Sequence, residues 1–335
     1  MLEDEIARTR FHALDLSRGI AALGILIFHL AGRAWPLNAL YIFVDFFFVL
    51  SGFVLYNQIP KSIKFSNQIV FARKRFVRLV PTAWLVILAT YLAYFSIQKL
   101  NLIDSEDRVA VSYISLLLAL FFLQSVLPFC GVLVTPMWSL STEIVVNFIF
   151  SIVGLKKNYV FLLALISGAS LGVAGLYGNN TNSTSGWIAL MRGIYGFSCG
   201  LIAREMANLK VGVSKSIMTV VFSTNIAVFY VVSLSAQYLI LVAPIMAGSV
   251  YVLSKIKLTN SRMISLSAKS GEYSFGLYLW HFPVIYFVNT LIYDNIHLPN
   301  LMVIKFLEIV TIFILAILLT WLTLKITKRT SNNSS

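Results

Sequence analysis

The chain has 335 residues, of which 59% are hydrophobic and only 12% are charged, and its mean hydropathy is +0.84. Soluble domains carry about 25% charged residues, so this composition excludes a soluble protein with a mostly wetted surface. Lys and Arg outnumber Asp and Glu by 26 to 13, a net charge of +13. In a membrane protein such an excess belongs in cytoplasmic loops, where it sets orientation, so we do not infer nucleic-acid binding from it.

Apolar stretches recur along the whole chain, and each is close to the roughly 20 residues that a membrane-spanning helix needs. They predict an all-α integral membrane protein. Because the connections are short and no internal repeat is visible, we expect a single transmembrane domain over residues 1–329 and a disordered tail over 330–335. The stretches cover residues 12–32, 38–59, 79–97, 110–128, 136–155, 158–177, 187–203, 216–234, 237–254, 273–292 and 302–324.

Charge placement predicts how these segments cross the membrane. Basic residues gather in six places, which hold 20 of the 26: residues 8–10, 61–78, 156–157, 204–215, 255–269 and 325–329. Both termini are therefore predicted to be cytoplasmic, which requires an even number of spans. Eleven segments break that parity once, so one of 110–128 and 136–155 should not cross. Pro128, Gly131 and Pro136 suit a re-entrant turn, and we expect about ten transmembrane helices plus one re-entrant or partly inserted segment.

The first stretch carries three polar side chains that a membrane span normally avoids. Asp15 lies one turn before Arg18 and can pair with it. Arg18 and His29 are eleven residues apart, which places them on nearly the same helix face and about 16 Å apart along the axis. A structural ion pair with a packed histidine is the simpler interpretation, but it does not explain an isolated histidine in apolar sequence. Ionisable residues inside a membrane usually function there.

The second stretch and the connection after it carry two further groups of polar residues. Asp45 is the only charge in the second stretch, where Ser51 and the glycine after it favour close helix packing. The connection over 60–78, which we predict to be a loop, holds six basic residues, among them Arg73, Arg75 and Arg78. Orientation alone can explain this charge. If the segment is helical, however, Arg75 and Arg78 share one face, and arginine forks suit phosphate groups.

Two later segments contain candidate site residues. Trp138 precedes Glu143, an acid that either compensates a helix dipole or, as we prefer, points inward near an active centre. Tyr278 and His281 lie in the tenth stretch, where His281 can serve simply as a hydrogen-bonding partner of a neighbouring helix. Ser141 lacks the Gly-x-Ser-x-Gly context of a serine nucleophile. The isolated charges Arg192 and Glu308 receive no assignment, and Cys130 and Cys199 have the environment of small buried hydrophobes.

Taken together, these residues resemble the acyltransferase-3 family of membrane acyltransferases, and the motifs occur in the family's order over most of the chain. Phe43 departs from the pattern, because a small residue is usual there. The chain resembles the family's stand-alone branch, whose members lack a soluble esterase-like domain. The resemblance rests on Arg-x10-His (Arg18, His29), Val-Asp-x-Phe-Phe-x-x-Ser-Gly-Phe (44–53), Arg-x-x-Arg (Arg75, Arg78), Trp-Ser-Leu-x-x-Glu (Trp138, Glu143) and Tyr-x-x-x-Leu-Tyr-Leu-x-His-x-Pro (273–283).

The resemblance implies a reaction in the bacterial inner membrane. An acyl group, usually acetyl, would pass from acyl-CoA to a hydroxyl of an envelope glycan, such as lipopolysaccharide O-antigen or exopolysaccharide, without a metal. His29 would be the general base, since an imidazole titrates near neutrality. Arg18 would hold phosphate or the oxyanion, with Asp15 fixing it, and Glu143 would orient His29 or the acceptor. Arg73, Arg75 and Arg78 would bind the CoA phosphates, while Asp45, Ser51, Trp138, Tyr278 and His281 would support substrate or structure.

The main alternative is a transporter or a lipid-linked glycan flippase, which would also use intramembrane charges. Transporters typically contain paired, repeat-related broken helices, and the sequence has no such repeat. A non-catalytic scaffold would leave the Arg18 and His29 stripe without a role. The partners expected are therefore acyl-CoA, a lipid-linked or surface glycan, and membrane lipid.

Overall fold

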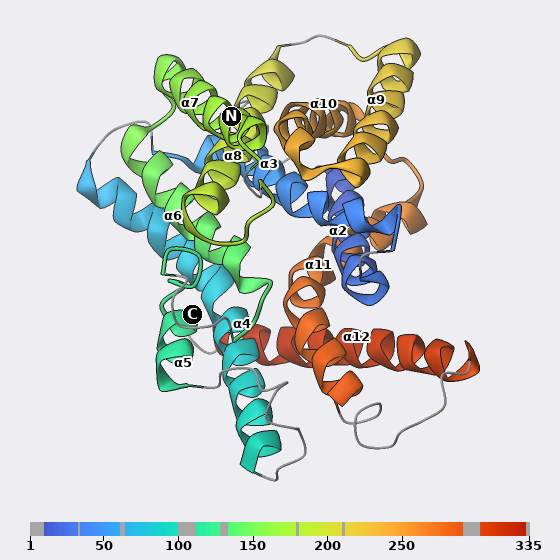
Figure 1. The fold of residues 1–335 in the computed structure, drawn as a ribbon. Helices are drawn as coiled ribbons and strands as arrows, with labels where there is room; N and C mark the ends of the chain where they lie inside the picture. Colours follow the sequence, from blue (N-terminus) through green and yellow to red (C-terminus); the bar gives the residue numbers. More distant parts are fainter. Residues whose placement is uncertain are drawn as a thin grey trace.

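A computed structural model describes residues 10–32, 34–60, 64–99, 112–127, 133–178, 181–209, 212–290 and 302–332. Every regular element within these ranges is a helix, which confirms the all-α prediction (Figure 1). The helices are α2 (His12–Ala31), η1 (Leu37–Ile42), α3 (Phe43–Leu55), η2 (Tyr56–Gln58), α4 (Phe65–Lys99), α5 (Tyr113–Leu120), α6 (Met137–Val153), α7 (Lys157–Leu176), α8 (Gly186–Asn208), α9 (Lys215–Leu234), η4 (Ala236–Leu241), α10 (Val242–Lys255), α11 (Ser261–Val288) and α12 (Met302–Asn332).

Each predicted apolar segment contains at least one helix in the structure. Among the described residues, eight helical segments are long and apolar enough to cross a membrane, so a multi-pass membrane protein is supported. The count of ten spans and the cytoplasmic placement of both termini stay predictions. Helix α12 continues to Asn332, three residues into the predicted tail, while 333–335 lie outside the described residues.

Helix α4 corrects one prediction, because most of the basic connection over 60–78 is not a loop. The helix starts at Phe65 and runs without interruption to Lys99. No Gly or Pro occurs between Phe65 and Val80, and Lys, Arg and Gln are good helix formers. Arg75 and Arg78 therefore share one helical face, as the three-residue spacing required.

Helix α5 is much shorter than α6, the helix in the other segment of uncertain crossing. Its eight residues rise about 12 Å, far less than the roughly 30 Å hydrocarbon core. Helix α6 has 17 residues, about 26 Å of rise, and comes much closer to a span. The geometry favours 110–128 as the partly inserted segment. Pro128 and Gly131 of the predicted re-entrant turn lie outside the described residues.

Small residues set the closest helix contacts. Helix α3 packs on α8, where a Cβ added to Gly200 would lie 1.9 Å from the carbonyl oxygen of Val49. Helix α2 packs along α11, and α12 (red) lies across α11 (Figure 1). Phe43, the departure from the family's pattern, is accommodated by Gly24, whose added Cβ would lie 2.3 Å from the Phe43 ring. These contacts bring α2, α3, α8 and α11 together around the polar residues.

Candidate active site

Two cavities contain most of the predicted site residues. The first cavity, about 630 Å³, is formed by α2, α3, α4, α6, α11 and α12. Its charged lining residues are Arg18, Arg75, Arg78, Glu143 and Glu272. The first cavity therefore holds one more cation than anion. Arg73 is exposed on α4 and does not line the first cavity. It lies two residues before Arg75, and side chains two residues apart on a helix do not share a face.

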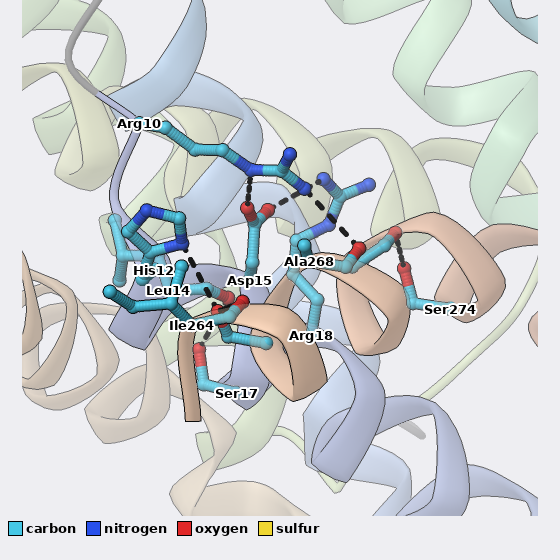
Figure 2. A network of polar contacts seen from close by, with 11 residues as sticks. Arg10, His12, Leu14, Asp15, Ser17, Arg18, Ile264, Ala268 and Ser274 are labelled. Carbon is cyan, nitrogen blue, oxygen red and sulfur yellow. Dashed lines mark hydrogen bonds and ion pairs between the residues drawn. The ribbon is translucent and has the colours of Figure 1, made fainter. Parts of the chain in front are cut away.

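An ion-pair network joins α2 to α11 beside the first cavity. Asp15 Oδ1 lies 3.7 Å from Arg18 Nη1, which confirms the predicted pairing. Figure 2 shows Arg10 reaching the same carboxylate, where its Nε donates to Asp15 Oδ2 at 2.6 Å. Arg10 Nη2 also donates to the carbonyl oxygen of Ala268 in α11 at 3.2 Å. Asp15 thus contacts two arginines, of which Arg18 lines the first cavity.

Glu143 lies in the first cavity, where its partner is an arginine. Arg75 Nη2 donates to Glu143 Oε1 at 2.5 Å, and Ser51 Oγ donates to the same oxygen at 3.0 Å. These contacts join α4, α3 and α6. They also neutralise part of the Arg75 charge, while Arg18 and Arg78 are the other two guanidinium groups of the lining. The structure does not bring Glu143 to His29, which lines the second cavity.

The second cavity, about 340 Å³, contains His29. His29 Nδ1 lies 3.0 Å from the carbonyl oxygen of Ile25 and 3.3 Å from Nε2 of His281. Aromatic rings of Phe28, Tyr41, Trp138 and Tyr278 line the same space, together with the backbone and side chains of residues 182–184. The second cavity combines an imidazole with flat apolar surfaces and hydrogen-bonding groups, which is the lining expected for a sugar.

A buried ion pair supports the second cavity and gives Arg192 a role. Arg192 Nε and Nη2 donate to the two oxygens of Asp45 at 3.1 and 2.8 Å, and the two side chains are 2% and 5% exposed. Arg192 Nη1 donates to the carbonyl oxygens of Asn182 and Ser183 at 3.1 and 3.4 Å. The pair therefore fixes the backbone of residues 182–183 at the cavity. Sequence reasoning missed it because the partners are 147 residues apart.

Tyr278 forms part of the wall of both cavities. Of the described residues, it is the one that lines both. Its hydroxyl donates to the carbonyl oxygen of Pro136 at 3.0 Å and lies 2.7 Å from Ser139 Oγ. Its ring packs 5.7 Å from Phe47 and 5.8 Å from His281, measured between centroids. A substrate spanning the two cavities would pass this side chain.

The predicted residues thus fall into two groups. Asp15, Arg18, Ser51, Arg75, Arg78 and Glu143 surround the first cavity, and His29, Trp138 and Tyr278 line the second, with Asp45 and His281 directly behind. Glu308 lies on α12 and lines neither cavity. The arrangement can hold an anionic molecule at one end and a neutral hydroxyl compound at the other.

Comparisons with known proteins find a matching family model and several relatives. A family model described as "Acyltransferase domain" (Acyl_transf_3) matches residues 11–325. The O-acetyltransferase OatA of Staphylococcus aureus (strain NCTC 8325 / PS 47) is 28% identical over 316 residues, 83% of this chain and 51% of that protein. Protein 2 in the picA locus of Rhizobium radiobacter is 35% identical over 188 residues, 49% of this chain and 94% of that protein. The chain spans about half the length of its OatA relatives, and no solved structure matches it significantly.

Proposed function

We propose that this chain, which belongs to the acyltransferase-3 family, is an acyl-CoA-dependent O-acyltransferase of the bacterial inner membrane. The donor is acetyl-CoA or another short acyl-CoA. The acceptor is a hydroxyl of an envelope glycan such as lipopolysaccharide O-antigen or exopolysaccharide. The observation that carries the proposal is the pair of cavities, one cationic and one containing His29, which share Tyr278 as a wall.

The first cavity suits the donor. CoA carries a diphosphate and a 3′-phosphate, and guanidinium groups bind phosphate through charge-assisted, bidentate hydrogen bonds. Arg18 and Arg78 supply two such groups, and Arg75 supplies a third that Glu143 holds in place. Residues 8–10 and the basic start of α4 both belong to the clusters that the charge pattern assigns to the cytoplasm.

The second cavity suits the acceptor. Tyr41 and Trp138 offer aromatic faces on which a sugar ring can pack, and residues 182–184 offer hydrogen-bonding groups. The connection that contains these residues carries no Lys or Arg, which assigns it to the outer side. Donor and acceptor would therefore enter from opposite faces of the membrane and meet beside Tyr278.

His29 acts as the general base in this reaction. Its Nδ1 faces the Ile25 carbonyl, so Nε2 is the nitrogen that removes the hydroxyl proton. The alkoxide oxygen attacks the thioester carbonyl, the C–O bond forms and the C–S bond breaks. The departing thiolate then takes the proton back from His29. Arg18 lies about 16 Å from His29 along α2 and lines the other cavity, which favours phosphate over the oxyanion as its target.

Membrane vesicles from cells that carry the chain test the proposal, because they contain the natural acceptor. Radiolabelled acetyl-CoA should transfer label to glycan in wild-type vesicles. Transfer should fall by about 10²- to 10⁴-fold in His29→Ala vesicles with equal amounts of chain, the usual contribution of a general base. Unchanged transfer in His29→Ala would refute the role of His29. Glycan movement across the membrane without label would support the flippase alternative instead.

A further inference from the structure

A second imidazole lies directly behind His29. His281 is on α11, is 0% exposed, and has its ring centroid 4.9 Å from that of His29. Its Nε2 lies 3.3 Å from Nδ1 of His29, a contact between residues 252 positions apart. Because α11 packs along α2, this contact is part of the main interface between the two helices. The proposed reaction as described so far leaves His281 without a role.

The proton positions of the pair follow from the neighbouring carbonyl group. The carbonyl oxygen of Ile25 can only accept a hydrogen bond, so the neutral His29 ring must carry its proton on Nδ1. That proton also faces Nε2 of His281, which must then accept, so His281 carries its own proton on Nδ1. The opposite tautomer of His29 would place two lone pairs against each other at Ile25. One arrangement of protons satisfies both contacts, and it leaves Nε2 of His29 free as a base.

We propose that His281 is a positioning residue: its Nε2 holds the His29 ring in the orientation and tautomer that general-base catalysis needs, and this role rests on the proposed function. The Ile25 carbonyl belongs to α2 itself and lies four residues before His29, so it does not fix the ring relative to another helix. The contact from α11 does so. When His29 takes up the hydroxyl proton, the lone pair of His281 also faces the new positive charge.

The surroundings of the pair explain why a neutral partner is used. No carboxylate is among the described residues that line the second cavity, and the titratable or charged groups there besides His29 are Tyr41, Arg192 and Tyr278. Arg192 is already neutralised by Asp45. A carboxylate behind His29 would add an unpaired charge inside the membrane, which is strongly unfavourable. An imidazole accepts the same hydrogen bond without that charge.

Three substitutions at position 281 separate positioning from packing. In His281→Gln the amide oxygen can occupy the place of Nε2 and accept the bond from His29. In His281→Asn the shorter amide occupies the place of Nδ1 and does not reach His29. His281→Leu keeps the apolar volume and removes every acceptor. Each variant is assayed in vesicles with radiolabelled acetyl-CoA, at an amount in the membrane equal to that of the wild type. Its thermal stability in detergent is measured and compared with that of the wild type, so that a folding defect is recognised.

The maximal rate should fall on the order of 10- to 100-fold in His281→Leu and His281→Asn, the range found for partners that orient metal-binding imidazoles. It should return to within a few-fold of wild type in His281→Gln, and the KM for acetyl-CoA should stay unchanged in all three. Equal loss in His281→Gln and His281→Leu would overturn the positioning role, as would a KM change alone. If wild-type vesicles transfer no label, or His29→Ala remains active, the proposed function itself fails.

Discussion

Replacing Arg192 by Met leaves the Asp45 carboxylate buried without a counter-charge. The two side chains are 2% and 5% exposed and form two hydrogen bonds, so water cannot compensate the loss. Removing one partner of such a buried pair costs about 3–5 kcal/mol, because the remaining charge stays desolvated. We expect the free energy of unfolding to fall by that amount in Arg192→Met. In the double variant, Asp45→Leu with Arg192→Met, most of it should return, since no charge is then left unpaired.

The assay is denaturant unfolding of the purified chain in mild detergent, followed by tryptophan fluorescence. Lys157 and Glu205 provide the matched control, because their ion pair is 2.5 Å long but 71% and 31% exposed. Lys157→Met should therefore leave the free energy of unfolding close to that of the wild type, because solvent screens an exposed ion pair. A cost below about 1 kcal/mol for Arg192→Met would refute the reasoning from burial. So would a double variant that is less stable than both single variants.

Three further predictions concern the cavities and the helix packing. Arg78→Ala should raise the KM for acetyl-CoA but not the KM for acetyl-pantetheine, which lacks the 3′-phosphate and the diphosphate. Arg73→Ala, outside the first cavity, should change neither KM. An equal rise of the two KM values in Arg78→Ala would contradict a phosphate role. Tyr278→Ala opens the wall shared by both cavities and should raise the transfer rate with butyryl-CoA relative to the rate with acetyl-CoA. An unchanged ratio of these two rates in the label-transfer assay would exclude Tyr278 as a limit on acyl size. Gly200→Ala pushes a methyl group against a backbone carbonyl of α3 and should lower the free energy of unfolding by about 1–3 kcal/mol. Gly248→Ala, whose Cβ would lie 3.9 Å from its nearest neighbour, should be nearly neutral. Equal costs of the two substitutions would refute close α3–α8 packing.

The features that sequence predicted well are local ones. Runs of apolar residues predict helices directly, and the ion pair of Asp15 with Arg18 follows from their three-residue spacing on one turn. The failure at α4 has the same origin. Its first 14 residues are too charged to look like a membrane span, although they contain no helix breaker and continue the same helix. Polarity was taken as a sign of a loop, whereas it marks the part of a long helix that borders the first cavity.

The partners of the buried charges could not be predicted, because they depend on which helices become neighbours. Glu143 was expected to orient His29 or the acceptor, and in the structure it pairs with Arg75. Asp45 and Arg192 each looked isolated in sequence, yet they neutralise each other across α3 and α8. One signal was available: two opposite charges in otherwise apolar segments are expensive unless paired. That rule identifies the candidates for a pair but leaves the choice among several acids and arginines open.

Mass spectrometry of surface polysaccharide tests the central claim most directly. The comparison is between cells that carry the wild-type chain, cells that carry His29→Ala in equal membrane amount, and cells that carry neither. The account predicts that one sugar gains the mass of a single acyl group with the wild type alone, and the size of that gain identifies the donor. Polysaccharide of identical mass in all three, or the same acyl gain with His29→Ala, would contradict it.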